Sequence, residues 1–205
     1  MELLDCIAAS LAAASPADLE ADDRTRAAVA MILRQGGSGL ELFLIQRASH
    51  DQDPWSGHLA FPGGKVEPGE EPKQAAERET CEEVGLDLGK ARYLGPLGEI
   101  TGHSLPVRVA GYVYALNGCG SRPVLSDEVH DSFWVGFKDL LDDERHITAT
   151  VTFDGRAHQV PAIRLPFADI PVLWGLTYRM VMNFMAICRL RGGADHLQYW
   201  ENAIN

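Results

Sequence analysis

Three closely spaced glutamates are the strongest sign of chemistry in this sequence. The stretch 72–84 is expected to form a helix of 3.6 residues per turn, which places Glu79, Glu82 and Glu83 at i, i+3 and i+4 on one face. Carboxylates this close repel each other, and a divalent cation would remove that repulsion. Oxygen ligands of this kind suit Mg²⁺ or Mn²⁺. The alternative is a solvated acidic face with Arg78 as a local ion-pair partner.

The ends of this helix carry their own signals. Pro72 suits the first turn, and Gly85 suits the residue that stops the helix. Ala75 and Ala76 are expected one turn before the glutamates on the same side, where their small size would leave room for a ligand.

The loop before the helix has residues that favour a close approach to a ligand. Gly63 and Gly64 allow the backbone to take positive φ and to approach a bound group closely. Pro68 and Gly69 indicate a tight turn, which can direct Glu70 back toward the helix. This loop favours the metal-site interpretation over a merely acidic surface.

This segment resembles the Nudix box, G-x5-E-x7-R-E-U-x-E-E-x-G-U, in which U is aliphatic. Thr80 stands at the first U and keeps the β-branched shape. The matching residues are Gly64, Glu70, Arg78, Glu79, Glu82, Glu83, Gly85 and Leu86.

The resemblance implies an α+β Nudix fold, with a mixed β-sheet between helices (α/β/α). It implies a pyrophosphatase that hydrolyses a nucleoside diphosphate linked to another moiety. The resemblance also implies that the main-chain carbonyl of Gly63 and the side chains of Glu79, Glu82 and Glu83 bind Mg²⁺ or Mn²⁺. It implies that Arg78 orients a box glutamate and that Gly63 and Gly64 lie beside the substrate. Structural roles are implied for Gly64, Glu70 and Gly85.

A second, longer resemblance, over residues 40–191, is to the coenzyme A pyrophosphatase branch of that family. That branch has an upstream signature, L-L-T-x-R-[SA]-x followed by R-x3-G-x3-F-P-G-G. Four positions match, and two depart: Ile45 replaces the threonine, and Asp53 replaces the second arginine. An arginine there contacts phosphate, whereas Asp53 would repel it. The resemblance implies cleavage of coenzyme A to 3′,5′-ADP and 4′-phosphopantetheine, and ADP-ribose, NADH or a nucleotide sugar stay open as alternatives. The matched positions are Arg47, Ser49, Gly57 and Phe61.

Residues outside the box complete the hypothesis. Glu128, in the segment 127–129, is the candidate for an extra metal ligand or general base, because many Nudix enzymes recruit such a glutamate. Arg47, at the end of an apolar run, is the candidate phosphate contact. Weaker candidates, with a structural role as the alternative, are His58 and His103 for phosphate, and Trp55, Tyr112 and Tyr114 for stacking on a base.

The remaining elements follow from hydrophobic patterning. A helix over 1–15 and a connection to residue 26 precede a single Nudix domain over 27–205. The expected strands are 27–33 and 40–47, joined as a hairpin, then 58–61, 93–100, 107–116 and 133–135; a second hairpin joins 147–153 to 157–165 around Asp154-Gly155, and a long helix covers 173–190.

Composition limits the partners. The chain has 205 residues and a formal net charge of −11, so it is a poor non-specific binder of nucleic acid or an anionic membrane. Scattered cysteines and an acidic N-terminus without a secretory pattern indicate a cytoplasmic protein. The expected partner is a small-molecule nucleotide, and a homodimer contact through the apolar C-terminal helix is a further hypothesis.

Overall fold

The computed structural model describes residues 3–14, 23–37, 39–49, 55–102, 106–116, 122–153 and 155–190. Asp53 and His103 lie outside the described residues. The α-helices are α1 (Leu3–Ala14), α2 (Pro72–Val84), α3 (Phe137–Leu140) and α4 (Gly175–Ile187), with 3-10 turns at Leu88–Lys90 and Asp143–Arg145. The strands are β1 (Thr25–Gly36), β2 (Gly39–Arg47), β3 (Leu59–Ala60), β4 (Gly63–Lys65), β5 (Arg92–Thr101), β6 (Val107–Leu116), β7 (Val129–Gly136), β8 (His146–Phe153) and β9 (Arg156–Ile163).

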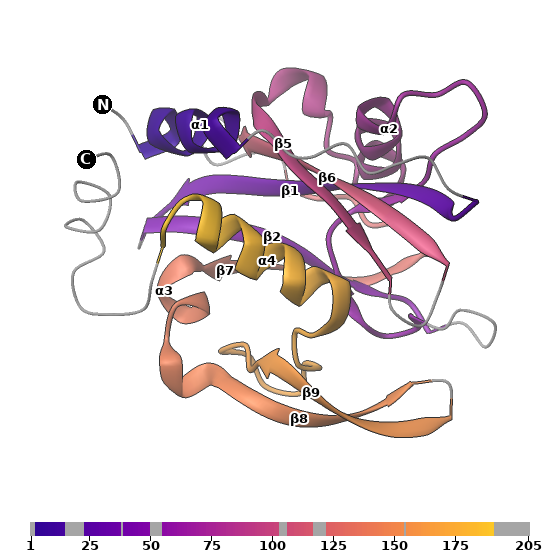
Figure 1. The fold of residues 1–205 in the computed structure, drawn as a ribbon, viewed down its shortest axis with the longest axis vertical. Helices are drawn as coiled ribbons and strands as arrows, with labels where there is room; N and C mark the ends of the chain where they lie inside the picture. Colours follow the sequence, from indigo (N-terminus) through magenta and orange to yellow (C-terminus); the bar gives the residue numbers. More distant parts are fainter. Residues whose placement is uncertain are drawn as a thin grey trace.

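Seven strands form one mixed sheet, in which β1 and β6 run parallel and the other pairs are antiparallel (Figure 1). The main path is β3-β2-β1-β6-β5, while β4 pairs with β1 and β7 pairs with β2. The strands β8 and β9 form a separate two-stranded sheet.

A split between β1 and β2 places the loop before α2. The two strands pair only near their hairpin, from Leu33↔Leu42 to Gly36↔Gly39. Farther along, β4 pairs with the start of β1 and β3 pairs with the end of β2. The connection from β3 to β4 therefore lies in the gap where the two long strands have separated.

Two hydrophobic cores cover the two faces of the sheet. Strand side chains alternate between faces, and in β1 Ala30 and Ile32 belong to the core beneath α2, whereas Met31 and Leu33 belong to the opposite core. That second core also includes side chains of α1 and α4. The expected α+β arrangement, a mixed sheet between helices, is confirmed.

The sequence predicted most elements closely, including the short β3, and missed some of the other short ones. Both hairpins and the helix over 72–84 are confirmed. The strand expected at 133–135 is part of the longer β7, because β7 pairs with β2 along most of its length. The predictions omitted β4 and α3, whose few residues are too short for a periodic pattern. The strand β1 begins at Thr25, inside the expected connection, and the division of the chain at residue 26 stays a prediction.

No helix among the described residues is long and apolar enough to cross a membrane.

The packing of α1 on β5 yields a stability prediction. Leu11 is fully buried, and a Cβ added at Gly95 of β5 would lie 3.0 Å from its Cβ. Leu11→Ala should lower the free energy of unfolding by about 2–5 kcal/mol, measured by urea denaturation, because it leaves a cavity. The matched control is Ala13→Ser on the exposed side of the same helix, which should change little. If the free energy of unfolding of Leu11→Ala equals that of the unmodified protein, the packing of α1 does not stabilise the core.

Candidate active site

The position of α2 is set by small side chains on its buried face. Ala75 and Ala76 are completely buried, with 0% exposure. Both pack in the same core as Ala28 and Ala30 of β1. The expectation that they leave room for a ligand was wrong, because that side of α2 faces the sheet. Their small size instead lets α2 lie close to β1.

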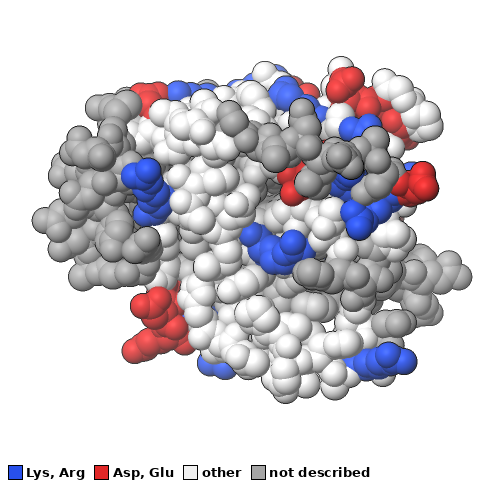
Figure 2. All heavy atoms as spheres, in the orientation of Figure 1, with Lys and Arg blue, Asp and Glu red and all other residues white. Residues whose placement is uncertain are grey.

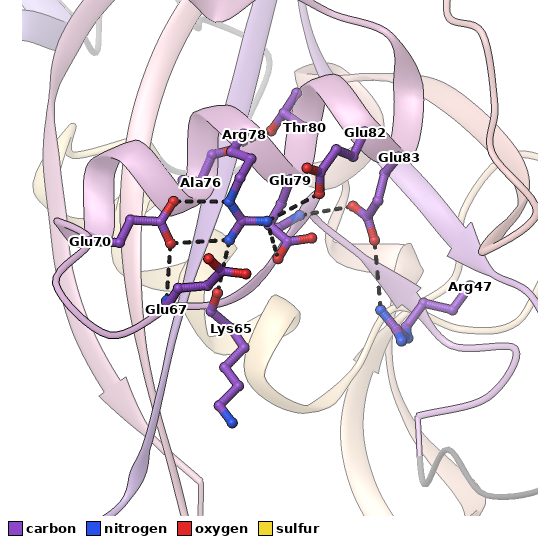
Figure 3. A network of polar contacts seen from close by, with 11 residues as sticks. Arg47, Lys65, Glu67, Glu70, Ala76, Arg78, Glu79, Thr80, Glu82 and Glu83 are labelled. Carbon is purple, nitrogen blue, oxygen red and sulfur yellow. Dashed lines mark hydrogen bonds and ion pairs between the residues drawn. The ribbon is translucent and has the colours of Figure 1, made fainter.

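Arg78 holds several acidic groups together at the solvent side of α2 (Figure 3). Its Nε and Nη2 donate to the two oxygens of Glu70 at 2.9 and 3.1 Å. Its Nη1 donates to Glu79 at 2.9 Å and to Glu82 at 3.1 Å. Nη2 also donates to the main-chain oxygen of Lys65 at 3.2 Å. One guanidinium thus fixes two glutamates of the helix relative to β4 and to the preceding loop.

Glu70 closes that loop through charge and backbone bonds. Its carboxylate accepts from the Glu67 amide at 3.0 Å, and its own amide donates to the Glu67 oxygen at 3.1 Å. The bond from Arg78, with help from the Glu67 amide, lowers the pKa of Glu70. The hydrogen bond to Glu70, followed by the one to Glu79, raises the pKa of Arg78. Both groups therefore keep their charges, which is consistent with a structural role for Glu70.

Glu83 is the buried acid of the site. Its side chain is only 3% exposed, and its Oε2 accepts from the Gly63 amide at 2.9 Å. Burial raises its pKa to about 7, against the opposing effects of the Gly63 bond and of Arg47. The Arg47 Nη1 lies 3.9 Å from Glu83 Oε1. Arg47 therefore reaches the glutamate cluster, as its position at the end of β2 suggested.

The two glycines of the loop have different reasons to be glycine. Gly63 has φ of 149°, and a side chain there would collide with the main-chain oxygen of Ala28. At Gly64 an added Cβ would lie 2.5 Å from the carboxyl carbon of Glu79. The Glu79 carboxylate therefore lies directly over Gly64, and burial raises its pKa, with Glu82 and Glu128 adding to the effect.

Glu128 lies on a segment that is bonded to the end of α2. The Val124 amide donates to Val84 and the Ser126 amide donates to Glu83, both at 2.9 Å. The Ser126 hydroxyl accepts from the Glu128 amide at 3.3 Å. Glu128 is exposed, and its charge adds to the raised pKa of both Glu79 and Glu83. The structure thus brings Glu128 near the box glutamates.

The C-terminal stop of α2 also contributes to this arrangement. Gly85 is left-handed, with φ of 67°, and its amide donates to Cys81 at 2.9 Å. A Cβ on Gly85 would lie 3.2 Å from Cβ of Val124. Sequence reasoning missed Val124 and Ser126, because their backbone bonds to α2 leave no mark in residue type.

Three further candidates make contacts with other parts of the fold. Tyr114 is 1% exposed and donates to Glu77 at 2.9 Å, so it anchors α2 to β6. Trp55 packs on the core beneath α1 and α4. The His58 ring lies 4.9 Å from the Trp174 ring, between centroids.

The expected metal ligands are close together but do not converge as a ready cluster. Within the described ranges, no three His, Cys, Asp or Glu side chains are arranged to hold a metal ion. The bonds from Arg78 use one oxygen of Glu79 and one of Glu82, and Glu83 bonds to the amide of Gly63. Metal coordination, including that by the Gly63 carbonyl, stays a prediction.

The donor set nevertheless fits a divalent cation. Burial, and to a smaller extent repulsion from neighbouring glutamates that include Glu128, raises the pKa of Glu79 and Glu83, and a bound cation would reverse that effect. Carboxylate oxygens are the ligands that Mg²⁺ and Mn²⁺ prefer.

Comparison with known proteins agrees with this geometry. Residues 23–154 match the family model described as the NUDIX domain. An uncharacterised protein of Schizosaccharomyces pombe is 39% identical over 108 residues, covering 49% of this chain and 33% of that protein. A probable nudix hydrolase of the same yeast is 29% identical over 165 residues, covering 79% of this chain and 56% of that protein. The chain therefore spans only part of the length of these relatives.

A solved structure shows the same fold at low identity. A MutT/nudix family protein from Enterococcus faecalis superposes with a TM-score of 0.56 at 16% identity, over 85% of this chain and 65% of that one. Because the family model matches well over half of the sequence and contains the glutamate helix described above, this chain belongs to the Nudix family.

Proposed function

We propose that the protein is a metal-dependent Nudix pyrophosphatase that hydrolyses the diphosphate of a nucleoside diphosphate linked to another moiety. One observation carries this proposal: Arg78 holds Glu79 and Glu82 in place while Glu83 is buried against the Gly63 amide. A Nudix module that had kept the fold and lost catalysis would usually have lost box glutamates, whereas Glu79, Glu82 and Glu83 are all present here.

A divalent ion, Mg²⁺ or Mn²⁺, would be held by Glu79, Glu82 and Glu83 with the Gly63 carbonyl. When bound, such an ion neutralises the diphosphate, polarises phosphorus–oxygen bonds and lowers the pKa of the attacking water. It also accounts for an acidic chain, of net charge −11, that accepts an acidic substrate.

The protein's own residues position the reactants. Gly63 and Gly64 let the diphosphate approach the backbone, and Arg47 is placed to contact a phosphate near Glu83. Glu128, near the two raised-pKa glutamates, is the candidate to take the proton of the attacking water. Water adds to phosphorus, the bridging phosphorus–oxygen bond breaks, and two phosphomonoesters leave. Arg78 keeps the glutamates oriented through this sequence.

Coenzyme A is the substrate that the flanking residues favour, with 3′,5′-ADP and 4′-phosphopantetheine as products. The support is the upstream signature at Arg47, Ser49, Gly57 and Phe61. Asp53 departs from that signature and favours ADP-ribose, NADH or a nucleotide sugar instead. A small-molecule nucleotide is thus the proposed partner. Cytoplasmic location and a homodimer stay predictions.

A substrate panel tests the function. Coenzyme A, ADP-ribose, NADH and nucleotide sugars are incubated with the chain and Mg²⁺ or Mn²⁺, and the products are identified by mass spectrometry. We expect coenzyme A to give the two phosphomonoesters, with no turnover in excess chelator. If only another nucleotide is hydrolysed, the assignment of coenzyme A as substrate is wrong. If none of the nucleotides is hydrolysed, the proposed pyrophosphatase activity is wrong.

Glu82→Gln should lower kcat by at least about 100-fold, because it removes a charged ligand that stabilises the transition state. The matched control is Glu77→Gln on the same helix, where Glu77 bonds to Tyr114 and Lys73 away from the site. Steady-state kinetics with the best substrate of the panel measure both. Near-normal turnover by Glu82→Gln would exclude the metal assignment.

Gly64→Ala should separate activity from stability. The new methyl group would lie 2.5 Å from the end of the Glu79 side chain, which is flexible and can move away. We expect kcat to fall by about 10-fold or more, because a displaced catalytic group costs rate steeply. The midpoint of thermal unfolding should hardly change. A variant that unfolds early yet turns over normally when folded would show that Gly64 serves the fold alone.

A further inference from the structure

The hairpin β8–β9 stands apart from the main sheet and has a role that the glutamate site does not explain. Its strands pair from His146↔Ile163 to Phe153↔Arg156, so Phe153 and Arg156 lie at the outer end. Figure 1 shows this end extending beyond the start of α4. A two-stranded hairpin is marginal on its own, so its outer half needs a contact with the domain.

That contact is a group of aromatic rings. The Phe153 ring lies 6.0 Å from Trp174 and 6.4 Å from His58, between centroids. Because the rings of His58 and Trp174 also meet at 4.9 Å, the three form one group, and each is only partly buried. The hairpin side that carries Phe153 therefore faces the domain.

The same side of the hairpin carries polar groups that stay exposed. Residues directly opposite in an antiparallel pair share a face, as do residues two apart along a strand. Arg156 is opposite Phe153, and His158 is opposite Val151, so all four lie on the domain-facing side. Arg156 and His158 are nevertheless exposed. On the domain-facing side of the hairpin, the β9 residues are therefore open to solvent at this end, whereas Phe153 of β8 contacts the domain.

Among the described residues, the charge on this side of the hairpin is positive. The described hairpin residues, 146–153 and 155–163, include no aspartate or glutamate, although the chain as a whole has a net charge of −11. Within the described ranges Arg156 has no carboxylate partner, and Figure 2 shows basic atoms at the outer end of β8–β9. An exposed guanidinium beside aromatic rings matches a planar base that carries a phosphate.

The open side is connected to the glutamate site through His58. The main-chain oxygen of His58 accepts from the Arg47 amide at 3.0 Å, and the Arg47 side chain reaches Glu83. The Thr177 hydroxyl of α4 donates to the Leu59 oxygen at 3.2 Å, which ties the helix that follows Trp174 to the same strand. The rings therefore border the loop that precedes Gly63.

We propose that Phe153, Arg156, His158, His58 and Trp174 form a subsite, the hairpin subsite, for the nucleoside half of the substrate. The base stacks against the rings, and Arg156 binds a phosphate on the ribose that is additional to the diphosphate. This inference rests on the proposed function and deepens it, since the subsite selects nucleosides with an extra phosphate, as in coenzyme A, over those without one.

Equilibrium binding tests the subsite without relying on turnover. Adenosine 3′,5′-bisphosphate and adenosine 5′-monophosphate are titrated into the full chain by calorimetry. Arg156→Gln should weaken bisphosphate binding by about 10-fold and leave monophosphate binding unchanged, because it removes one charge-assisted contact. The matched control is Arg164→Gln, an exposed arginine just beyond the other end of β9, which should change neither.

Phe153→Leu provides the second arm. This substitution should weaken the binding of both nucleotides by about 5-fold or more, because both carry a base that stacks on the rings. Equal effects of Arg156→Gln on the two nucleotides, or no effect, would overturn the phosphate contact. If Phe153→Leu instead weakens the binding of 4′-phosphopantetheine and of neither nucleotide, the hairpin subsite does not bind the nucleoside half of the substrate. Absence of bisphosphate binding to the unmodified chain overturns the proposal outright.

The hydrolysis assay separates this inference from the proposed function. If coenzyme A is not hydrolysed but bisphosphate binding depends on Arg156, the substrate proposal fails while the subsite stands. If coenzyme A is hydrolysed and KM is unchanged in Arg156→Gln, the subsite fails while the function stands.

Discussion

Repulsion among carboxylates is the constraint on which the rest of this structure depends. Glu79, Glu82 and Glu83 occupy adjacent positions of one helix, and Glu128 adds a fourth charge nearby. A single guanidinium, that of Arg78, offsets part of this repulsion, and its planar fork serves Glu70, Glu79 and Glu82 at once. Arg78 leaves part of the negative charge near Glu83 uncompensated, and this charge would favour a bound cation.

The sheet is built so that this helix and its loop can meet. Because β1 and β2 separate beyond their hairpin, the short strands β3 and β4 pair with one long strand each. The connection between them positions the Gly63 amide to donate a hydrogen bond to Glu83, and it places Gly64 under the Glu79 carboxylate. Ala75 and Ala76 bring the helix down onto β1. A site of this kind is held by regular elements, which keeps its geometry precise.

Around this centre the chain distributes its charges unevenly. Glu79, Glu82 and Glu83 gather on α2, whereas the described residues of β8–β9 lack acids and expose Arg156. With a cation held by these glutamates, as proposed, such an arrangement would suit a ligand that is anionic at two separate points. The aromatic contact of Phe153 with His58 and Trp174 joins the two regions, because the main-chain oxygen of His58 accepts a hydrogen bond from the Arg47 amide.

The sequence by itself determined the family, the α+β fold, the helix 72–84 and its three glutamates, because spacing along a helix and glycine positions are local properties. Only the tertiary structure decided which side of that helix is buried, since Ala75 and Ala76 could face either a ligand or the sheet. It also decided that Ser126 and Val124 dock Glu128 beside α2, and that Phe153 reaches His58. These contacts join residues distant in sequence through backbone bonds and packing, which residue type alone does not encode.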